Sequence, residues 1–513
     1  MRLLVLFVCL AIVGCEQGSS ASKPATGSPA ATGPAPHPEL GINLTGIVDW
    51  STELPFTDAF KTSRPWLESG PGPFTYDDRG NPLLRRGQVV DTMMLRGLNG
   101  HYPSGVYVAT YEGSGQIDVR FGDVIDVVKQ QPGRIEFRVR PADEGIMIRV
   151  LASSPRDPIR NVRVWLPGFE GQKGIFHPTF LDRLKPFSVV RFMDWQHTNG
   201  STVFTWSQRA KLDDARWSTE VGAPIETMCE LANAAHVHPW FCIPHGADDD
   251  FIRNLATLIK EKLDPSLKVY LEYSNEVWNW SFAQTTYASD RGKKLHLGAP
   301  DHLRFYAKRS IEAFDIFGEV FGSNDRLVRI LSGQFANPSD SDAVLKYHDA
   351  YRHADALAVG AYFGYDIGLS KNLDAMLKLS PERIIDKLAQ EIDGSYRDNL
   401  RRQKKIAQKY GLQLMTYEGG QHLVGVGEAQ GNDQLTRLFI ETNRHPRMTE
   451  LYQKQLNYWV NEGGSTFTAF SFVGQPSKFG SWGILEFQDQ PEEQAPKYRA
   501  FSAFAKTPAA TNK

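Results

Sequence analysis

Two glutamates stand out because each closes a short apolar run and is followed by polar or aromatic residues. Glu276 follows the run of residues 268–273 within Ser-Asn-Glu-Val-Trp, and Glu418 follows the run of residues 412–417 within Thr-Tyr-Glu-Gly-Gly. One protonated and one ionised carboxyl group, placed on either side of a glycosidic bond, can cleave it by double displacement. Glu276 is the candidate acid/base and Glu418 the candidate nucleophile.

Glu272 is a rival for the acid/base role because it lies only four positions before Glu276. It falls inside the apolar run, however, and no asparagine precedes it. We expect Glu272 to lie in a buried polar layer and prefer Glu276.

The two glutamates lie far apart in the sequence, so the fold must bring them together. Short β-branched runs alternate with helical patterns, which is typical of a parallel sheet with crossover helices. The eight runs are residues 41–48, 188–193, 237–243, 268–273, 327–331, 356–361, 412–417 and 466–472. Eight such units predict an α/β fold, a (β/α)₈ TIM barrel, in which the carboxyl ends of the strands converge on one face. Strands four and seven would then bring Glu276 and Glu418 to one cleft.

One segment lacks this rhythm. Residues 88–166 contain several alternating runs and turn signals but no convincing helical pattern. We expect an inserted β-sandwich there, between the first two barrel strands, which leaves residues 39–87 and 167–508 for the barrel. Its role, glycan binding or structural support, stays open.

The first residues have the pattern of an export signal. Arg2, an apolar run and Gly-Cys resemble a bacterial lipoprotein signal peptide over residues 1–15, with Cys15 as the lipidated residue. The Ser-, Ala- and Pro-rich residues 16–38 suit a flexible linker. We expect an exported, membrane-anchored lipoprotein at the outer membrane, cell surface or periplasm. An ordinary signal peptide with an incidental cysteine is the alternative.

The composition narrows the possible partners and cofactors only in part. The 57 Lys and Arg residues nearly balance the 59 Asp and Glu residues, so nothing favours a nucleic-acid partner. Cys229 and Cys242 allow either a disulfide or two buried thiols. His236 and His238 form a His-x-His pair, which is more often structural than metal-binding, and we predict no catalytic metal or other cofactor.

The Asn275-Glu276 pair at the end of strand four, with Glu418 ending strand seven, resembles clan A of the glycoside hydrolases. The resemblance covers residues 39–505 without the insertion and implies the barrel fold, a retaining mechanism and a polysaccharide or oligosaccharide substrate. It implies that Asn275 binds the sugar 2-hydroxyl, and Arg191, Tyr362 and Trp482 fit further positions of the clan. Loop residues at the same face are additional candidates for substrate contact: Trp278, His245 and Trp195.

Three other functions remain open. The chain could be a surface lipoprotein that binds glycan without cleaving it, or a transglycosylase in which a sugar intercepts the glycosyl-enzyme. A barrel hydrolase with a metal-bound water would draw on a polar set: Asp194, His197, His236, His238 and His245. The sequence does not fix the sugar, the linkage, endo or exo action, or the oligomeric state.

Overall fold

The computed structural model describes residues 39–507, whose centre is a closed barrel of eight parallel strands. The strands, in barrel order, are β1 (Leu40–Asn43), β12 (Val189–Arg191), β13 (His238–Ile243), β14 (Val269–Tyr273), β15 (Leu327–Gly333), β16 (Ala356–Phe363), β17 (Gln413–Gln421) and β18 (Phe467–Ala469). Pairing of β1 with both β12 and β18 closes the ring. The predicted TIM barrel and the number of its strands are confirmed.

Alternation along the strands separates two cores. On β13, Trp240 and Cys242 belong to the cluster inside the barrel, whereas Phe241 and Ile243 belong to the larger cluster between strands and helices. Successive side chains of a strand point to opposite faces, so every strand is buried on both sides. Buried apolar faces on both sides hold the barrel in one register.

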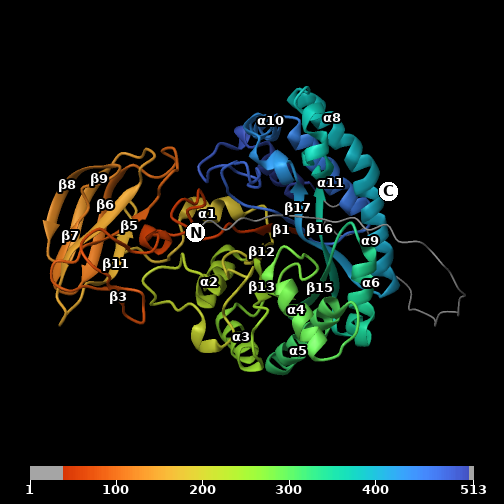
Figure 1. Ribbon diagram of the computed structural model, residues 1–513, viewed down its shortest axis with the longest axis horizontal. Helices are drawn as coiled ribbons and strands as arrows, with labels where there is room; N and C mark the ends of the chain where they lie inside the picture. Colours follow the sequence, from red (N-terminus) through yellow and green to blue (C-terminus); the bar gives the residue numbers. More distant parts are fainter. Residues whose placement is uncertain (1–38, 508–513) are drawn as a thin grey trace, which may run out of the picture.

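Helices surround the barrel on its outer side (Figure 1). They are α1 (Pro178–Leu184), α2 (Ile225–Ala235), α3 (Asp249–Lys262), α4 (Ala283–Lys294), α5 (Asp301–Phe321), α6 (Pro338–Lys346), α7 (Leu373–Met376), α8 (Pro381–Glu391), α9 (Arg397–Lys409), α10 (Asp433–Arg444), α11 (Met448–Asn461) and α12 (Pro496–Ala505). Helix α3 shows the local logic, because Asp248 caps its first turn and Phe251, Leu255 and Ile259 form its buried face.

Two antiparallel sheets lie between β1 and β12 in the chain and beside the barrel in Figure 1. One has the order β2 (Leu67–Glu68), β5 (Val90–Met94), β10 (Ile146–Ser153), β7 (Gly115–Asp118). The other has the order β11 (Arg160–Trp165), β6 (Gly105–Glu112), β9 (Arg134–Val139), β8 (Val124–Gln131). A small ladder joins β3 (Thr75–Tyr76) to β4 (Pro82–Leu83).

The inner faces of the two sheets share one hydrophobic cluster, separate from the barrel cores. This cluster includes Leu54, Phe60 and Trp66, and β2 pairs with β5. The sheet region therefore begins before residue 88, the start predicted from sequence. Strands of two residues carry too little alternation to be recognised in advance.

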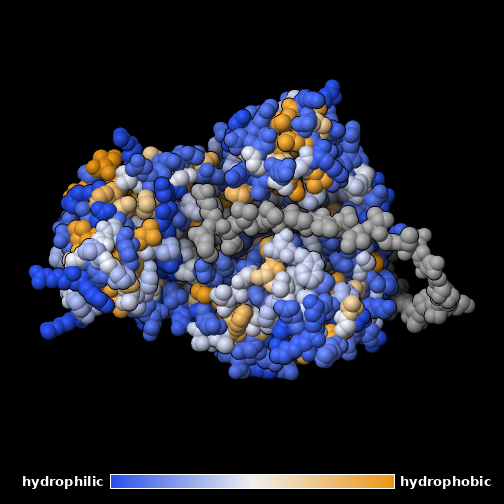
Figure 2. Space-filling model, viewed as in Figure 1, coloured by the Kyte–Doolittle hydropathy of each residue, from blue (hydrophilic) through white to orange (hydrophobic). Residues whose placement is uncertain are grey.

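The surface is mostly polar in the view of Figure 2, with apolar residues in small scattered groups. Among residues 39–507, no helix has the length and apolar character that a membrane span requires. Cys229 and Cys242 are both buried free thiols, which resolves the alternative left open by the sequence.

Candidate active site

Glu276 lies in the turn after β14, and only 4% of its surface is exposed. Ser274 and Glu276 both have left-handed backbone, with φ of 63° and 43°. Such backbone is strained for residues other than glycine and persists only where neighbours enforce it. Asn279 Nδ2 donates to Glu276 Oε2 at 2.9 Å, and Tyr417 Oη donates to Glu276 Oε1 at 3.0 Å. The turn thus holds the carboxyl group in one orientation.

Glu418 lies within β17, at a bulge. Thr416 pairs with Val359 and Glu418 with Gly360, so Tyr417 is an extra residue in the ladder. The extra residue breaks strict alternation at this point. Tyr417 lies in the interior cluster, two residues after Met415 as alternation requires, and contacts Glu276, while the bulge allows its neighbour Glu418 to reach the interior network too. The bulge is what places these two consecutive side chains in one site.

Arg191, the last residue of β12, is the centre of that network and is fully buried. Its Nε and Nη2 donate to Glu272 Oε2 at 3.1 and 2.9 Å. Its Nη1 donates to Asn43 Oδ1 and Glu418 Oε1, both at 3.0 Å, and Nη2 also donates to Asn275 Oδ1 at 2.9 Å. All five guanidinium donors are thereby used. Arg191 is thus buried and paired within the site, and its predicted contact with substrate stays a prediction.

Glu272 has the position expected for it. It is fully buried on β14, accepts from Arg191, and also accepts from Ser332 Oγ at 2.6 Å and Trp240 Nε1 at 3.0 Å. With its oxygens occupied in this way, Glu272 serves as a counter-ion inside the barrel and is not a rival for the acid/base role.

The two candidate glutamates have different electrostatic surroundings. Burial, and after it the negative charge of Glu418, raises the pKa of Glu276 to about 8. Burial also raises the pKa of Glu418, but the charge of Arg191 and a hydrogen bond from Tyr362 oppose this by stabilising the carboxylate. Of two coupled acids, the one with a cation and a donor ionises first. These surroundings favour the proton on Glu276 and the negative charge on Glu418.

Asp194 is a third acidic group of this site. Burial, and after it the charge of Glu418, raises its pKa to about 7. Its carboxylate forms no hydrogen bond or ion pair with the residues that the structure describes, and its side chain is partly exposed. It offers two acceptor oxygens to a ligand beside the nucleophile candidate.

Aromatic rings form one wall. Tyr362 Oη donates to Glu418 Oε2 at 2.8 Å. The Trp482 ring lies 5.8 Å from the Tyr362 ring, 5.1 Å from that of His422 and 5.8 Å from that of Phe470, all edge to face. Burial lowers the pKa of His422 to about 4, so this imidazole is neutral at pH 7. Tyr362 thus contacts the nucleophile candidate directly, and Trp482 packs against Tyr362. Both rings are partly exposed.

Other sequence candidates lie elsewhere. Trp195, predicted to contact substrate, is fully buried between Phe56 and Phe180, because the chain after β12 turns back against α1. His245 contacts the rings of Phe204 and Tyr287, and no contact joins it to either glutamate.

Trp278 follows Glu276 closely and is partly exposed, but its indole nitrogen is buried without a partner among the described residues. Asn275 is 2% exposed and its amide is already engaged, since Nδ2 donates to Asn199 Oδ1 at 2.9 Å. Its predicted contact with a sugar hydroxyl stays a prediction.

The candidate metal ligands are dispersed. His236 caps the end of α2 and His238 begins β13, so both lie at the amino end of that strand, opposite the glutamates. Within residues 39–507 no three His, Cys, Asp or Glu side chains are grouped as metal ligands.

Sequence reasoning missed the two groups that hold Glu276, Tyr417 and Asn279, and also Asn199, which holds Asn275. Tyr417 lies two residues after Met415, and alternation places both side chains inside the barrel, so its position could have been predicted. Asn279 is three residues after Glu276, a spacing that brings side chains together in a helical turn, and this signal was available.

No family model and no curated protein matches the chain. Solved structures similar in fold include fungal β-1,4-galactanases, at 11% identity and a TM-score of 0.36, over 63% of this chain and 91% of that one. The GH51 arabinofuranosidase from Xanthomonas axonopodis pv. citri is 12% identical with a TM-score of 0.40, over 65% of this chain and 67% of that one. The GH5-4 broad-specificity endoglucanase from Clostridium acetobutylicum is 12% identical with a TM-score of 0.36, over 65% and 92%. These neighbours are clan A glycoside hydrolases, and at these values the similarity concerns the fold alone.

Proposed function

We propose that this protein is a retaining glycoside hydrolase, with Glu418 as the nucleophile and Glu276 as the acid/base. The observation that carries the proposal is the unequal environment of two buried glutamates at the carboxyl ends of barrel strands. Glu418 accepts from Arg191 and Tyr362, whereas Glu276 forms no ion pair with the residues that the structure describes and has a raised pKa. One carboxylate and one carboxylic acid at the same pH are what double displacement requires.

The chemistry follows in two steps. Glu418 Oε attacks the anomeric carbon while Glu276 gives its proton to the departing oxygen, which leaves a glycosyl-enzyme and an ionised Glu276. Glu276 then takes a proton from water, whose oxygen attacks the same carbon and releases Glu418. Tyr417 and Asn279 keep the Glu276 carboxyl group in place through both steps.

In this proposal, the sugar is bound by side chains that have unused hydrogen-bond acceptors or exposed aromatic faces. Asp194 has unused acceptor oxygens beside Glu418, and Trp482 with Tyr362 offers aromatic faces to the apolar side of a sugar ring. The substrate is a polysaccharide or oligosaccharide in this proposal.

The non-catalytic alternative, glycan binding alone, has a weaker claim. A binding scaffold gains nothing from a protonated Glu276 that is held by two donors next to an ionised Glu418. Such a polarised pair costs desolvation energy and is typical of catalytic sites.

The test uses the purified protein and its Glu418→Ala variant on a panel of 4-nitrophenyl glycosides, β-1,4-galactan, mannan and β-glucan. We expect turnover by the wild type, a loss of about 10³-fold or more in the variant, and partial recovery with sodium azide, which replaces the missing carboxylate. Glu428→Ala, an exposed glutamate in the loop after β17, is the matched control and should turn over normally.

Stability must be followed in the same experiment, because Glu418 neutralises the buried Arg191. Thermal melting of Glu418→Ala with and without azide separates lost chemistry from lost folding. A folded Glu418→Ala variant with undiminished turnover would refute the proposal, and binding without cleavage by the wild type would favour the glycan-binding alternative.

A further inference from the structure

A hollow lies at the outer margin of the barrel, and neither of the two glutamates lines it. This outer cavity has a volume of about 630 Å³ and is enclosed by residues 245–250 and by helices α4 and α5. Its size falls within the range of small-ligand sites. Residues 245–250 follow β13, so the cavity opens at the same end of the barrel as the catalytic pair.

Aromatic side chains line one side of the outer cavity. His245 lies 4.9 Å from Tyr287, and Tyr287 lies 6.0 Å from Phe305. Phe204 extends this row, 6.0 Å from His245, and is 40% exposed. A Cβ atom on residue 246 would lie 2.0 Å from the Phe204 ring, so Gly246 is needed for this ring to pack here. An exposed phenyl ring is thus held in a fixed position beside the hollow.

A buried polar atom of the cavity wall lacks a partner. His245 is 7% exposed, and its Nδ1 has no hydrogen-bond partner among residues 39–507. Burial lowers the pKa of His245 to about 4, so at neutral pH the ring is uncharged and can accept or donate one hydrogen bond. A buried polar group without a partner costs free energy unless a ligand or water satisfies it.

The charges of the lining select the ligand class. Its cations Arg291, Lys308 and Arg309 are offset by acids, and Arg309 pairs with Asp249 at 2.7 Å. Lys308 pairs with Glu312, whereas Arg291 and Asp250 have no ion-pair partner in the described part of the chain. A balanced set favours neither an anion nor a cation. Aromatic faces with scattered donors and acceptors suit an uncharged sugar.

We propose that the outer cavity is a second, non-catalytic binding site for an uncharged glycan chain, with Phe204 as its stacking surface and Arg291, Asp250 and His245 as its polar contacts. The inference takes its ligand class from the proposed function, but it concerns a different site. It would hold a polysaccharide against the face of the barrel on which cleavage occurs.

Affinity electrophoresis tests this site independently of catalysis. Gels contain β-1,4-galactan, galactomannan, mixed-linkage β-glucan or the anionic carboxymethyl cellulose, and the protein carries Glu276→Gln so that the polymer stays intact. We expect retardation by at least one neutral polymer and a dissociation constant about 3- to 10-fold higher in Phe204→Ala or Arg291→Ala, the size expected for a lost stacking or polar contact. Hydrolysis of a 4-nitrophenyl glycoside by the same variants, made without Glu276→Gln, should be unchanged.

Matched controls are Leu212→Ala, an exposed apolar residue of the same loop, and Lys294→Ala, an exposed cation on α4 outside the lining. Equal retardation of all variants, no retardation by any polymer, or stronger retardation by carboxymethyl cellulose would overturn the inference. Retardation that depends on Phe204, in a protein that cleaves nothing, would keep this site and reject the proposed catalysis.

Discussion

At the scale of single residues, Tyr417 and Tyr362 act on different members of the pair: Tyr417 donates a hydrogen bond to Glu276, and Tyr362 donates one to Glu418. Both bonds stabilise an ionised carboxylate and so lower the pKa of the accepting group. Loss of either donor therefore raises one pKa of the pair. In the proposed mechanism, activity requires ionised Glu418 and protonated Glu276, which predicts a bell-shaped dependence of kcat/KM on pH.

We predict that Tyr417→Phe moves the alkaline limb of this profile to higher pH, because Glu276 then keeps its proton longer. Tyr362→Phe should instead move the acid limb to higher pH, because Glu418 then ionises later. Each variant should lose roughly 10-fold in kcat/KM at the optimum, the size of a lost hydrogen bond to a charged group. Full pH profiles on one aryl glycoside check both, and a shift of the same limb in both variants would contradict the assignment of roles.

Sequence patterns predict a residue well when its position depends only on where a strand ends. Glu276 follows the end of β14 as predicted, whereas Glu418 was predicted to follow strand seven but lies within β17, which continues to Gln421. Trp195 also follows a strand, yet it is buried, because the direction of the chain after β12 depends on packing against Phe180. Tyr417 was missed although alternation from Met415 places it inside the barrel, and the bulge that brings Glu418 to the same side depends on the partner strand, of which one strand's sequence carries no record.

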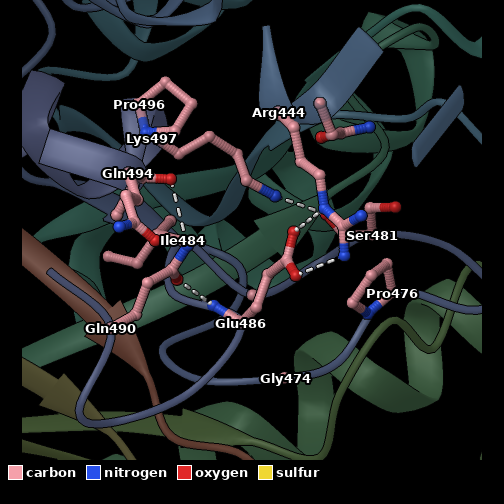
Figure 3. A pocket seen from close by; sticks show the side chains of 13 residues that line it. Arg444, Gly474, Pro476, Ser481, Ile484, Glu486, Gln490, Gln494, Pro496 and Lys497 are labelled. Atoms are coloured by element: carbon pink, nitrogen blue, oxygen red, sulfur yellow. Dashed lines mark hydrogen bonds and ion pairs between the residues drawn. The ribbon is translucent and has the colours of Figure 1, made fainter. Parts of the chain in front are cut away.

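At the scale of elements, the loop after β18 carries Trp482 to the site, and hydrogen bonds to the loop backbone hold it in place. Lys497, on α12, is 5% exposed and donates to the carbonyl oxygen of Ser481 at 2.5 Å, and Gln421 Nε2 donates to the same oxygen at 2.9 Å. Figure 3 shows the Lys497 side chain extended toward Ser481, beside the ion pair of Arg444 and Glu486. The neighbour of Ser481 is Trp482, so this fastening fixes the aromatic wall.

Burial lowers the pKa of Lys497 to about 7, whereas an unfolded lysine titrates near 10.5. The unfolded chain thus binds more protons between these values, and stability rises with pH across this window. Below pH 7 the folded protein bears the full cost of a buried charge. We predict that Lys497→Met raises the melting temperature more at pH 6 than at pH 9, yet raises KM because the Trp482 loop loosens.

Melting curves at both pH values and steady-state kinetics measure the two effects. Lys506→Met, at the exposed end of α12, is the control and should change neither. A KM equal to that of the wild type would show that Gln421 alone holds the loop.

At the scale of the whole molecule, we propose that the chain is exported and anchored by lipid on Cys15, which lies outside the described residues. Residues 1–15 have a lipoprotein signal pattern, and residues 16–38 have the composition of a tether. We predict that Cys15→Ser releases active protein into the soluble fraction of a bacterial host, whereas the wild type sediments with membranes. Fractionation and metabolic labelling with palmitate check this, and continued sedimentation of the variant would refute anchoring through Cys15.

The architecture was largely predictable because eight repeats of one pattern compensate for errors in any single one. The ends of the strands were predicted less accurately: β18 extends only over Phe467–Ala469, whereas residues 466–472 were predicted. The two-residue strand β2 was not foreseen, since its pairing with β5 is set by residues far along the chain.

The shared use of Glu418 by the fold and by the chemistry bears on how such a protein would change during evolution. Glu418 and Glu272 together balance the charge of Arg191, and removal of one partner from a buried ion pair costs about 3–5 kcal/mol. Glu276 forms no ion pair within residues 39–507, and glutamine would keep its shape. A lineage drifting from cleavage toward glycan capture would therefore lose Glu276 first and retain Glu418 as an inherited counter-ion. In such descendants, an intact Glu418 would be a relic of folding rather than a sign of turnover.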